Sequence, residues 1–243
     1  KSPSKSEIYL LASFKYESDK SIPVIFSLGN AALNCFKVLP DPVATSRIFN
    51  EDPKLLLFTL SRYKFVAKQF EGYESILEIG CQEGFGAPIV SQEIKRYVGF
   101  DFYKPHVEFA KNHLEVNDSK YRFFHQDILI KTTPNEQFEC AFALDVLEHI
   151  KKSDEEKFFE NIKKYLSDAK GPLILGMPSL ESQKYASERS KLGHVNCKTK
   201  QEFKLTCKKF YRDVFMFSMN DEVLHTGYNA MSQYLLALCC GPK

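Results

Sequence analysis

Short apolar segments alternate with amphipathic segments from residue 75 onward, and this alternation is the strongest constraint on the fold. The apolar segments have the length of buried strands, and those between them have helical periodicity. Strands alternating with helices form a parallel sheet covered on both faces. The sequence predicts strands over 75–80, 97–101, 121–125, 138–144 and 172–177, and helices over 88–95, 104–115 and 153–166.

The end of the chain has a different pattern. Thr199 and Glu202 have the spacing of a capping box ahead of a helix that ends near Phe210. Two apolar segments, 213–219 and 233–240, then follow with no helical periodicity between them. We therefore expect an antiparallel ending. The predicted fold is α/β, with a doubly wound, seven-stranded sheet whose last strand is reversed.

The first fifty residues do not share this alternation. Segments 8–16 and 22–28 are partly apolar, and the sequence leaves open whether they are strands or a small cap. The prolines at 40 and 42 interrupt the chain, and Asn50 or Asp52 together with Pro53 favours a helix start, with the helix over about 53–70. We expect an N-terminal extension or cap over residues 1–52 and one main domain over residues 53–243.

Composition excludes several classes of protein. No apolar run approaches the roughly 18 residues that a membrane span needs. The 33 basic and 31 acidic residues leave a formal charge of +2, so overall charge does not favour binding to nucleic acid. Seven cysteines, an odd number without a C-x-x-C pair, favour neither a disulfide framework nor a zinc knuckle. We expect a reducing, cytoplasmic compartment.

Glycine or acidic residues stand where four consecutive predicted strands end. Glycines 80, 84 and 86 follow the first strand, but their spacing is not that of the dinucleotide fingerprint G-x-G-x-x-G. Asp101 ends the second strand, Asp127 follows the third, and Asp145 ends the fourth. The carboxyl ends of parallel strands meet at one edge of a sheet, which is where ligands of open α/β sheets bind. The four strand ends predict a ligand site.

These residues resemble the motifs of a known family. Residues 77–81 are similar to the first motif of the class I S-adenosylmethionine-dependent methyltransferases, and 99–101 are similar to the second. Residues 126–128 and 145–150 resemble the third and fourth motifs. The resemblance spans about 75–177 and does not cover residues 1–50. It implies a Rossmann-like domain that uses S-adenosylmethionine and releases S-adenosylhomocysteine.

The resemblance also implies roles for individual residues. Gly80 would lie beside the methionine part of the cofactor, Asp101 would bind the ribose hydroxyls, and Asp145 would border the methyl-transfer site. Asp127 would accept a hydrogen bond from the adenine amino group, with Ile128 against the ring. The full set of expected cofactor-binding residues is Glu78, Gly80, Gln82, Gly84, Asp101, Phe102, Asp127, Ile128, Asp145 and Val146.

Gln82 departs from the family pattern, which often has glycine at this position. We expect its side chain to crowd the turn, although its backbone N–H remains available. This departure supports one alternative: a cofactor-binding module that has lost catalysis and serves as a partner subunit.

Two histidines are candidates for the acceptor side. A hydroxyl acceptor must lose a proton as the methyl group arrives, and imidazole has a suitable pKa for accepting it. His194 lies in the long connection after the fifth strand, and His149 follows the fourth strand. We expect His194, before His149, to act as the base, and a small-molecule hydroxyl to be the acceptor. The sequence does not indicate the oligomeric state.

The same region supports a second alternative. Asp145, Glu148, His149 and His194 form a set of oxygen and imidazole groups that could bind a divalent metal. This set resembles that of small-RNA 2′-O-methyltransferases, in which two Glu and two His surround a metal, but the first position here is Asp. We rank a metal-free site first and expect neither a metal nor a nucleic-acid acceptor.

Overall fold

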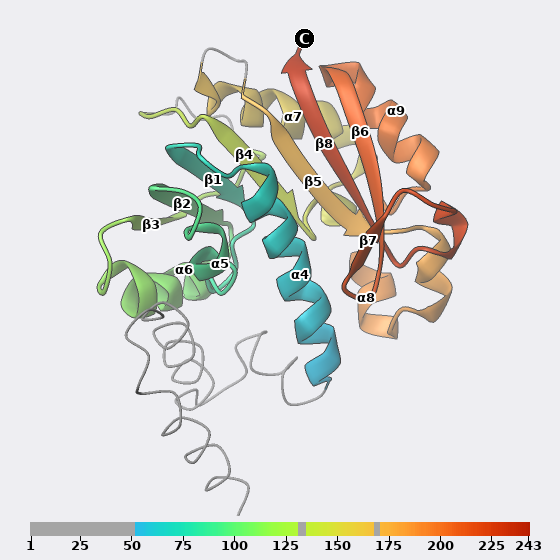
Figure 1. Ribbon diagram of the computed structural model, residues 1–243, viewed down its shortest axis with the longest axis horizontal. Coiled ribbons are helices and arrows are strands. Elements are labelled where there is room, and N and C mark those ends of the chain that lie inside the picture. Colours follow the sequence, from blue (N-terminus) through green and yellow to red (C-terminus); the bar gives the residue numbers. More distant parts are fainter. Residues whose placement is uncertain (1–51, 131–134, 168–170) are drawn as a thin grey trace, which may run out of the picture. The chain divides into compact units, whose positions relative to one another are not determined.

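The computed structural model describes residues 52–130, 135–167 and 171–243 (Figure 1). Eight strands form one sheet: β1 Ser75–Ile79, β2 Arg96–Asp101, β3 Tyr121–His125, β4 Cys140–Leu144, β5 Leu173–Pro178, β6 Tyr211–Asn220, β7 Val223–His225 and β8 Tyr234–Pro242. The helices of this part of the chain are α4 Pro53–Gln69, α5 Ala87–Val90, α6 Lys104–Ala110, α7 Glu155–Lys164, α8 Glu188–Gly193 and α9 Lys200–Phe210. The predicted segments 8–16 and 22–28 lie outside the described residues.

The strand order is β3-β2-β1-β4-β5-β8-β6-β7. Strands β1 to β5 are parallel, and the order reverses between β1 and β4. Strand β8 runs antiparallel between β5 and β6, so the predicted reversed last strand is confirmed. The predicted number of seven strands is wrong. Asp221 has a φ of 53°, which turns the chain back so that three residues pair with β6 as β7.

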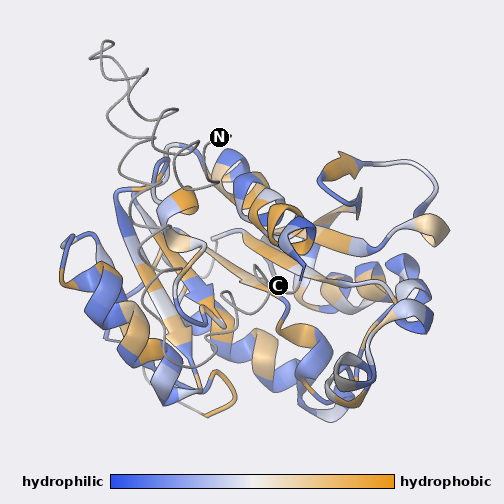
Figure 2. Cartoon of the chain, turned by 90° about the horizontal axis from the view of Figure 1, so that it is seen from below, coloured by the Kyte–Doolittle hydropathy of each residue, from blue (hydrophilic) through white to orange (hydrophobic). Residues whose placement is uncertain are grey.

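Two hydrophobic cores lie on the two faces of the sheet. One joins β1, β2, β4, β5 and β8 to α7 and α9, through residues such as Phe158, Phe159 and Phe203. The other joins the opposite faces of the strands to α4, α5 and α6, through residues such as Tyr63, Val66 and Val107. The strands in the middle of the molecule are accordingly hydrophobic, and the surrounding helices are mixed (Figure 2). The doubly wound architecture is confirmed.

The structure corrects three predicted helices. The segment expected over 88–95 is helical only in α5, which has four residues. Helix α6 continues into a π-helical turn, Lys111–Glu115. Helix α7 begins at Glu155 and not at Ser153, because a 3-10 turn over Lys152–Asp154 precedes it. Ser153 and Glu156 have the spacing of a capping box, but no side chain caps α7. The capping box of α9 is confirmed: Thr199 and Glu202 bond reciprocally.

Helix α4 begins as predicted, and its middle passes the carboxyl edge of the sheet before the chain enters β1. The Asp52 side chain accepts hydrogen bonds from the N–H groups of Lys54 and Leu55, and Pro53 occupies the first turn. Val66 and Phe70 pack in the hydrophobic core on one face of the sheet. One helical turn before Val66, Arg62 and Tyr63 lie beside the ends of β4 and β1, where they contact Asp145 and Glu78.

None of the described helices combines the length and apolar character needed to cross a membrane.

Candidate functional site

The loop after β1 packs closely against the loop after β4 at Gly80. Gly80 has a φ of +79°, a conformation that favours glycine. A Cβ atom at this position would lie 2.3 Å from Cγ2 of Val146. Any larger residue would therefore push the two loops apart. Two predicted cofactor-binding residues, distant in the sequence, are thus in direct apposition.

Asp101 is the fixed carboxylate of this edge. Its side chain is buried, and it accepts hydrogen bonds from the backbone N–H of Gln82 at 2.9 Å and of Tyr103 at 2.8 Å. Gln82 has a φ of 47°, and its side chain is exposed. Gln82 thus adopts a left-handed conformation that favours glycine, and the crowding expected from its side chain stays a prediction. The N–H of Gln82 holds Asp101 in place.

Glu78 lies beneath this loop, almost fully buried. The hydroxyl of Tyr63 donates a hydrogen bond to Oε1 of Glu78 at 3.0 Å, whereas Oε2 has no hydrogen-bond partner among the described residues. Burial raises the pKa of Glu78 well above its ordinary value, and the nearby carboxylate of Asp101 also raises it, against the Tyr63 hydrogen bond. The raised pKa favours the protonated form of Glu78, and a cation bound at this edge would favour the ionised form.

The other predicted cofactor-binding residues differ in how much of their surface is exposed to a ligand. Asp127 accepts a hydrogen bond from the N–H of Leu129 at 2.8 Å, as a turn residue does. Ile128 is 6% exposed and packs into one hydrophobic core, so little of its surface faces a ligand. Phe102, in contrast, is 73% exposed at the end of β2. Gly84 has a φ of +73° and packs against Phe123.

Asp145 is paired with an arginine that sequence reasoning missed. Nη1 of Arg62 lies 2.9 Å from Oδ2 and 3.2 Å from Oδ1 of Asp145. The guanidinium also stacks on the ring of Tyr234, with Cζ 3.7 Å from the ring centroid. Arg62 lies four residues before the buried Val66 on α4, and a single arginine on that side of an amphipathic helix was the available signal.

Glu148, His149 and His194 form a cluster close to Asp145. One possible ligand atom from each residue lies within 4.8 Å of the others. Glu148 is fully buried, and neither of its carboxylate oxygens has a hydrogen-bond partner among the described residues. Burial raises the pKa of Glu148 well above its ordinary value, and the carboxylate of Asp145 raises it further.

The hydrogen bonds of the two imidazoles define their tautomers. Nδ1 of His149 lies 2.9 Å from the carbonyl oxygen of Gly193, which can only accept. Nδ1 of His194 lies 2.8 Å from Oε1 of Gln183, whose amide nitrogen donates elsewhere. Both Nδ1 atoms therefore carry the proton, and both Nε2 atoms keep a free lone pair. The ring centroids are 5.1 Å apart.

Burial lowers the pKa of His194, and the neighbouring ring of His149 lowers it further. His194 is therefore neutral at neutral pH, with an Nε2 lone pair that can accept a proton or bind a metal. The predicted pair of histidines is brought together. A third histidine, His225, lies on the edge strand β7 and uses both nitrogens in hydrogen bonds to Asn220 and Gly227.

A buried ionic network fastens the loop that carries His194. Nζ of Lys198 lies 2.5 Å from Oε1 of Glu155, with both side chains 6% exposed. Asn196 donates to the same Glu155 oxygen at 2.8 Å and accepts from Lys198 at 2.8 Å. The N–H of Asn196 donates to the backbone oxygen of Glu148 at 3.0 Å. This network joins the His194 loop to the element that carries Glu148 and His149, and sequence reasoning did not find it.

Comparison with known proteins identifies the type of domain. Residues 76–169 match a family model described as a methyltransferase domain. No curated protein sequence matches the chain.

Solved structures share the fold at low identity. The small RNA methyltransferase HEN1 has a TM-score of 0.62 at 16% identity, covering 75% of this chain and 25% of that longer chain. The N-methyltransferase NodS from Bradyrhizobium japonicum WM9, in complex with S-adenosylhomocysteine, has a TM-score of 0.56 at 19% identity, covering 91% and 100%. The plantazolicin methyltransferase BpumL, also with S-adenosylhomocysteine, has a TM-score of 0.61 at 14% identity, covering 90% and 99%.

Proposed function

We propose that this chain is a class I S-adenosylmethionine-dependent methyltransferase and transfers a methyl group to a hydroxyl of a small-molecule acceptor. The observation that carries the proposal is the pair of imidazoles at the end of β4, each with a protonated Nδ1 and a free Nε2 lone pair. Such a pair provides a base for a hydroxyl nucleophile. An amine acceptor that binds in its uncharged form already has a free lone pair, so it needs a general base less than a hydroxyl does.

The carboxyl edge of the sheet suits a cationic cofactor. When bound, S-adenosylmethionine supplies a methyl group on a positively charged sulfur. The carboxyl groups of Asp101 and Glu78 lie on one side of this edge and those of Asp145 and Glu148 on the other, and the buried Oε2 of Glu78 has no described hydrogen-bond partner. Burial raises the pKa of Glu78 and of Glu148, and a cation bound between them favours their ionised forms. Asp101, already oriented by two backbone N–H groups, would bind the ribose hydroxyls through its remaining lone pairs. Phe102 would lie beside the cofactor with its exposed ring, and Asp127 would bind the adenine amino group.

His194 acts as the base in this proposal. Its lowered pKa keeps the ring neutral, so Nε2 can take the hydroxyl proton as the new bond to carbon forms. Gln183 holds the ring through Nδ1, which leaves Nε2 toward the shared cluster with His149. His149 is held by Gly193 and shapes the same pocket.

Single-turnover methyl transfer tests this assignment. A panel of hydroxyl-bearing small molecules and a labelled methyl donor would first identify an acceptor. His194→Ala should then lower the transfer rate by about a hundredfold or more, the usual range for a general base. His149→Ala is the matched variant and should lower it less. Affinity for S-adenosylhomocysteine should stay near that of the wild type in both. Full turnover by His194→Ala would exclude His194 as the base.

A second candidate function is metal-dependent 2′-O-methylation of an RNA end. The cluster of Glu148, His149 and His194 favours it, because a divalent cation would neutralise the buried carboxylate and use both free Nε2 lone pairs. HEN1, a small RNA methyltransferase, has the same fold. Bound there, a metal would polarise the acceptor hydroxyl. Arg62 disfavours this candidate, since it already neutralises Asp145, the fourth ligand that the sequence suggested.

Chelation separates the two candidates. Activity of the hydroxyl methyltransferase should survive EDTA. Loss of activity that Mg²⁺ or Mn²⁺ restores, together with methylation of an RNA end, would replace the first proposal by the second. Manganese binding followed by electron paramagnetic resonance in the wild type and in Glu148→Gln provides a readout that needs no acceptor.

A reducing, cytoplasmic location is part of the proposal. It is supported by the cysteines at 81, 140, 197, 207, 239 and 240, which are all unpaired. Burial raises the pKa of Cys197 to about 12, so its thiol is unreactive at neutral pH.

A further inference from the structure

His106 lies beside the carboxylate of Asp101, to which the proposed function assigns the ribose. His106 belongs to the first turn of α6, which starts at Lys104. Just before this helix, the N–H of Tyr103 donates to Oδ1 of Asp101. Nδ1 of His106 lies 3.8 Å from the same oxygen, beyond hydrogen-bond distance. The imidazole and the carboxylate are therefore neighbours that are not bonded to each other.

Nδ1 of His106 is a buried polar atom without a partner. It is shielded from solvent, and it has no hydrogen bond within the described part of the chain. The ring packs edge-on against the ring of Tyr103, with the two centroids 4.8 Å apart. The side chain as a whole is 26% exposed. Because part of the ring reaches solvent, the imidazole can gain or lose a proton while Nδ1 stays beside Asp101.

Two carboxylates from different elements act on His106. Asp101 ends β2, and Glu83 lies in the loop after β1, where its side chain is buried. The carboxylate of Asp101 raises the pKa of His106 and that of Glu83 raises it further, against the effect of burial. A substantial fraction of His106 is therefore charged near neutral pH. In the charged form Nδ1 carries a proton and can only donate.

Asp101 has few lone pairs left for a ligand. A carboxylate has about four acceptor positions, two on each oxygen. The N–H of Tyr103 occupies one position on Oδ1, and the N–H of Gln82 occupies one on Oδ2. One position remains on each oxygen, and the two hydroxyls of a ribose require both. A shift of about 1 Å would let the charged His106 donate to Oδ1 and occupy the position that one hydroxyl needs.

We propose that His106 is a positioning residue for the cofactor, which withdraws Oδ1 of Asp101 from the ribose when the imidazole is charged and leaves it available when the imidazole is neutral. Charge-assisted hydrogen bonds are about twice as strong as neutral ones, so the charged ring competes with a hydroxyl and the neutral ring does not. Protonation of His106 therefore weakens cofactor binding, and cofactor binding releases the proton, because the two are reciprocally coupled. The inference rests on the proposed contact between Asp101 and the ribose.

Calorimetric titration with S-adenosylhomocysteine at pH values from about 6 to about 8.5 tests the proposal. The affinity of the wild type should rise with pH by about fivefold or more. Binding near neutral pH should release protons, which appear as a difference in heat between buffers of different ionisation enthalpy. His106→Phe keeps a ring that cannot be charged, so its affinity should be nearly independent of pH and the proton release should disappear. His106→Asn does not titrate either and should behave in the same way if His106→Phe fails to fold.

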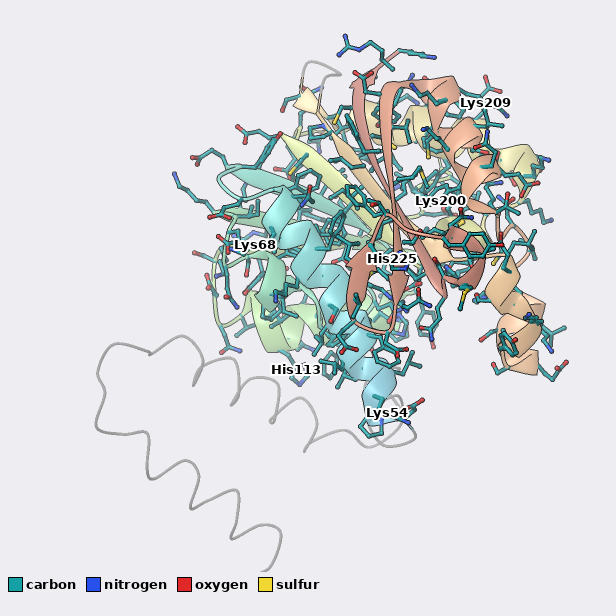
Figure 3. All side chains as sticks on the ribbon, turned by 45° about the vertical axis from the view of Figure 1, so that its right-hand side comes forward. Lys54, Lys68, His113, Lys200, Lys209 and His225 are labelled. Carbon is teal, nitrogen blue, oxygen red and sulfur yellow. The ribbon has the colours of Figure 1, made fainter. Side chains whose placement is uncertain are left out.

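His113→Phe is the matched control. His113 lies in the π-helical turn after α6, at the periphery of the molecule, and its Nδ1 donates to the carbonyl oxygen of Phe109 (Figure 3). This variant should keep the pH dependence of the wild type. Binding by the wild type that does not change with pH, or equal pH dependence in the wild type and His106→Phe, would overturn this inference and leave the proposed function standing. No binding of S-adenosylhomocysteine by the wild type at any pH would overturn both.

Discussion

Arg62 and Asp145 form an ion pair across 83 residues of sequence, with Nη1 of Arg62 2.9 Å from Oδ2 of Asp145. The helix that precedes the sheet thus supplies the cation for the carboxylate at the end of β4. Asp145 has a φ of 56°, a conformation uncommon for a residue with a side chain. The pair holds this residue at the border between the cofactor edge and the cluster of Glu148, His149 and His194.

Replacing Arg62 by methionine should destabilise the protein and strengthen metal binding. Arg62→Met leaves Asp145 and Glu148 without a neighbouring cation, and we expect a loss of about 1–3 kcal/mol in the free energy of unfolding, the cost of an unsatisfied buried partner. Urea unfolding with and without Mn²⁺ measures both effects. Added Mn²⁺ should stabilise Arg62→Met more than the wild type. Arg62→Lys, which keeps the charge, is the control, and equal stability of all three proteins would contradict the expectation.

Glu148 should make stability fall as pH rises. Its pKa is raised by burial and by Asp145, so between the ordinary carboxyl pKa and the raised one the folded state binds more protons than the unfolded state. This stabilising contribution is complete below the ordinary pKa and is lost as pH rises toward the raised value. Glutamine does not titrate, so Glu148→Gln should show a smaller fall.

Urea unfolding of the wild type and Glu148→Gln at several pH values from 5 to about 8 checks this. Glu78 has a pKa shifted in the same direction, and comparing the two proteins cancels its contribution. If the two proteins lost stability in parallel, Glu148 would not be the group that titrates.

Asp101 should control cofactor affinity. Asp101→Ala removes a buried acceptor, and we expect S-adenosylhomocysteine to bind more weakly by about 1.5–3 kcal/mol, roughly ten- to a hundredfold. Isothermal calorimetry gives the affinity. Because Asp101 also holds the N–H groups of Gln82 and Tyr103, the melting temperature without cofactor should fall as well. Asp118→Ala, in a turn before β3, is the matched control, and unchanged affinity in Asp101→Ala would exclude the ribose contact.

Lys198 should position His194 as well as stabilise the fold. Lys198→Met leaves the buried carboxylate of Glu155 unpaired, which costs about 3–5 kcal/mol in the free energy of unfolding. The released loop should expose His194 and separate it from His149, so the pKa of His194 should rise toward its ordinary value. Imidazole nitrogen NMR measures that pKa and the tautomer without any acceptor.

Lys95→Met is the control for this change, since Lys95 pairs with Glu74 at the surface and such pairs contribute little. Lys198→Met with an unchanged His194 titration would show that the network supports the fold alone.

Local sequence patterns predicted most of the fold. The apolar segments from Ser75 onward, the cap at Asp52 and the capping box of Thr199 and Glu202 all form where they were expected. Each of these features depends on residues within about four positions of one another, so the local sequence is sufficient to predict it. The wrong predictions also have local causes. Ser153 has the spacing of an N-cap, but it lies inside the 3-10 turn over Lys152–Asp154 and therefore does not cap α7.

The candidate site was predicted only as far as the strand ends. Because parallel strands end at one edge, the sequence alone brings Gly80, Asp101 and Asp145 together. It also predicted His149 and His194 as acceptor-side residues, which stays a prediction, although the structure does bring the two rings together. The pairing of Arg62 with Asp145, the network of Lys198, Glu155 and Asn196, and the tautomers of the two imidazoles were decided by the tertiary structure. Ion pairs and proton positions depend on which groups packing brings within about 3 Å, and no periodicity in a sequence records that distance.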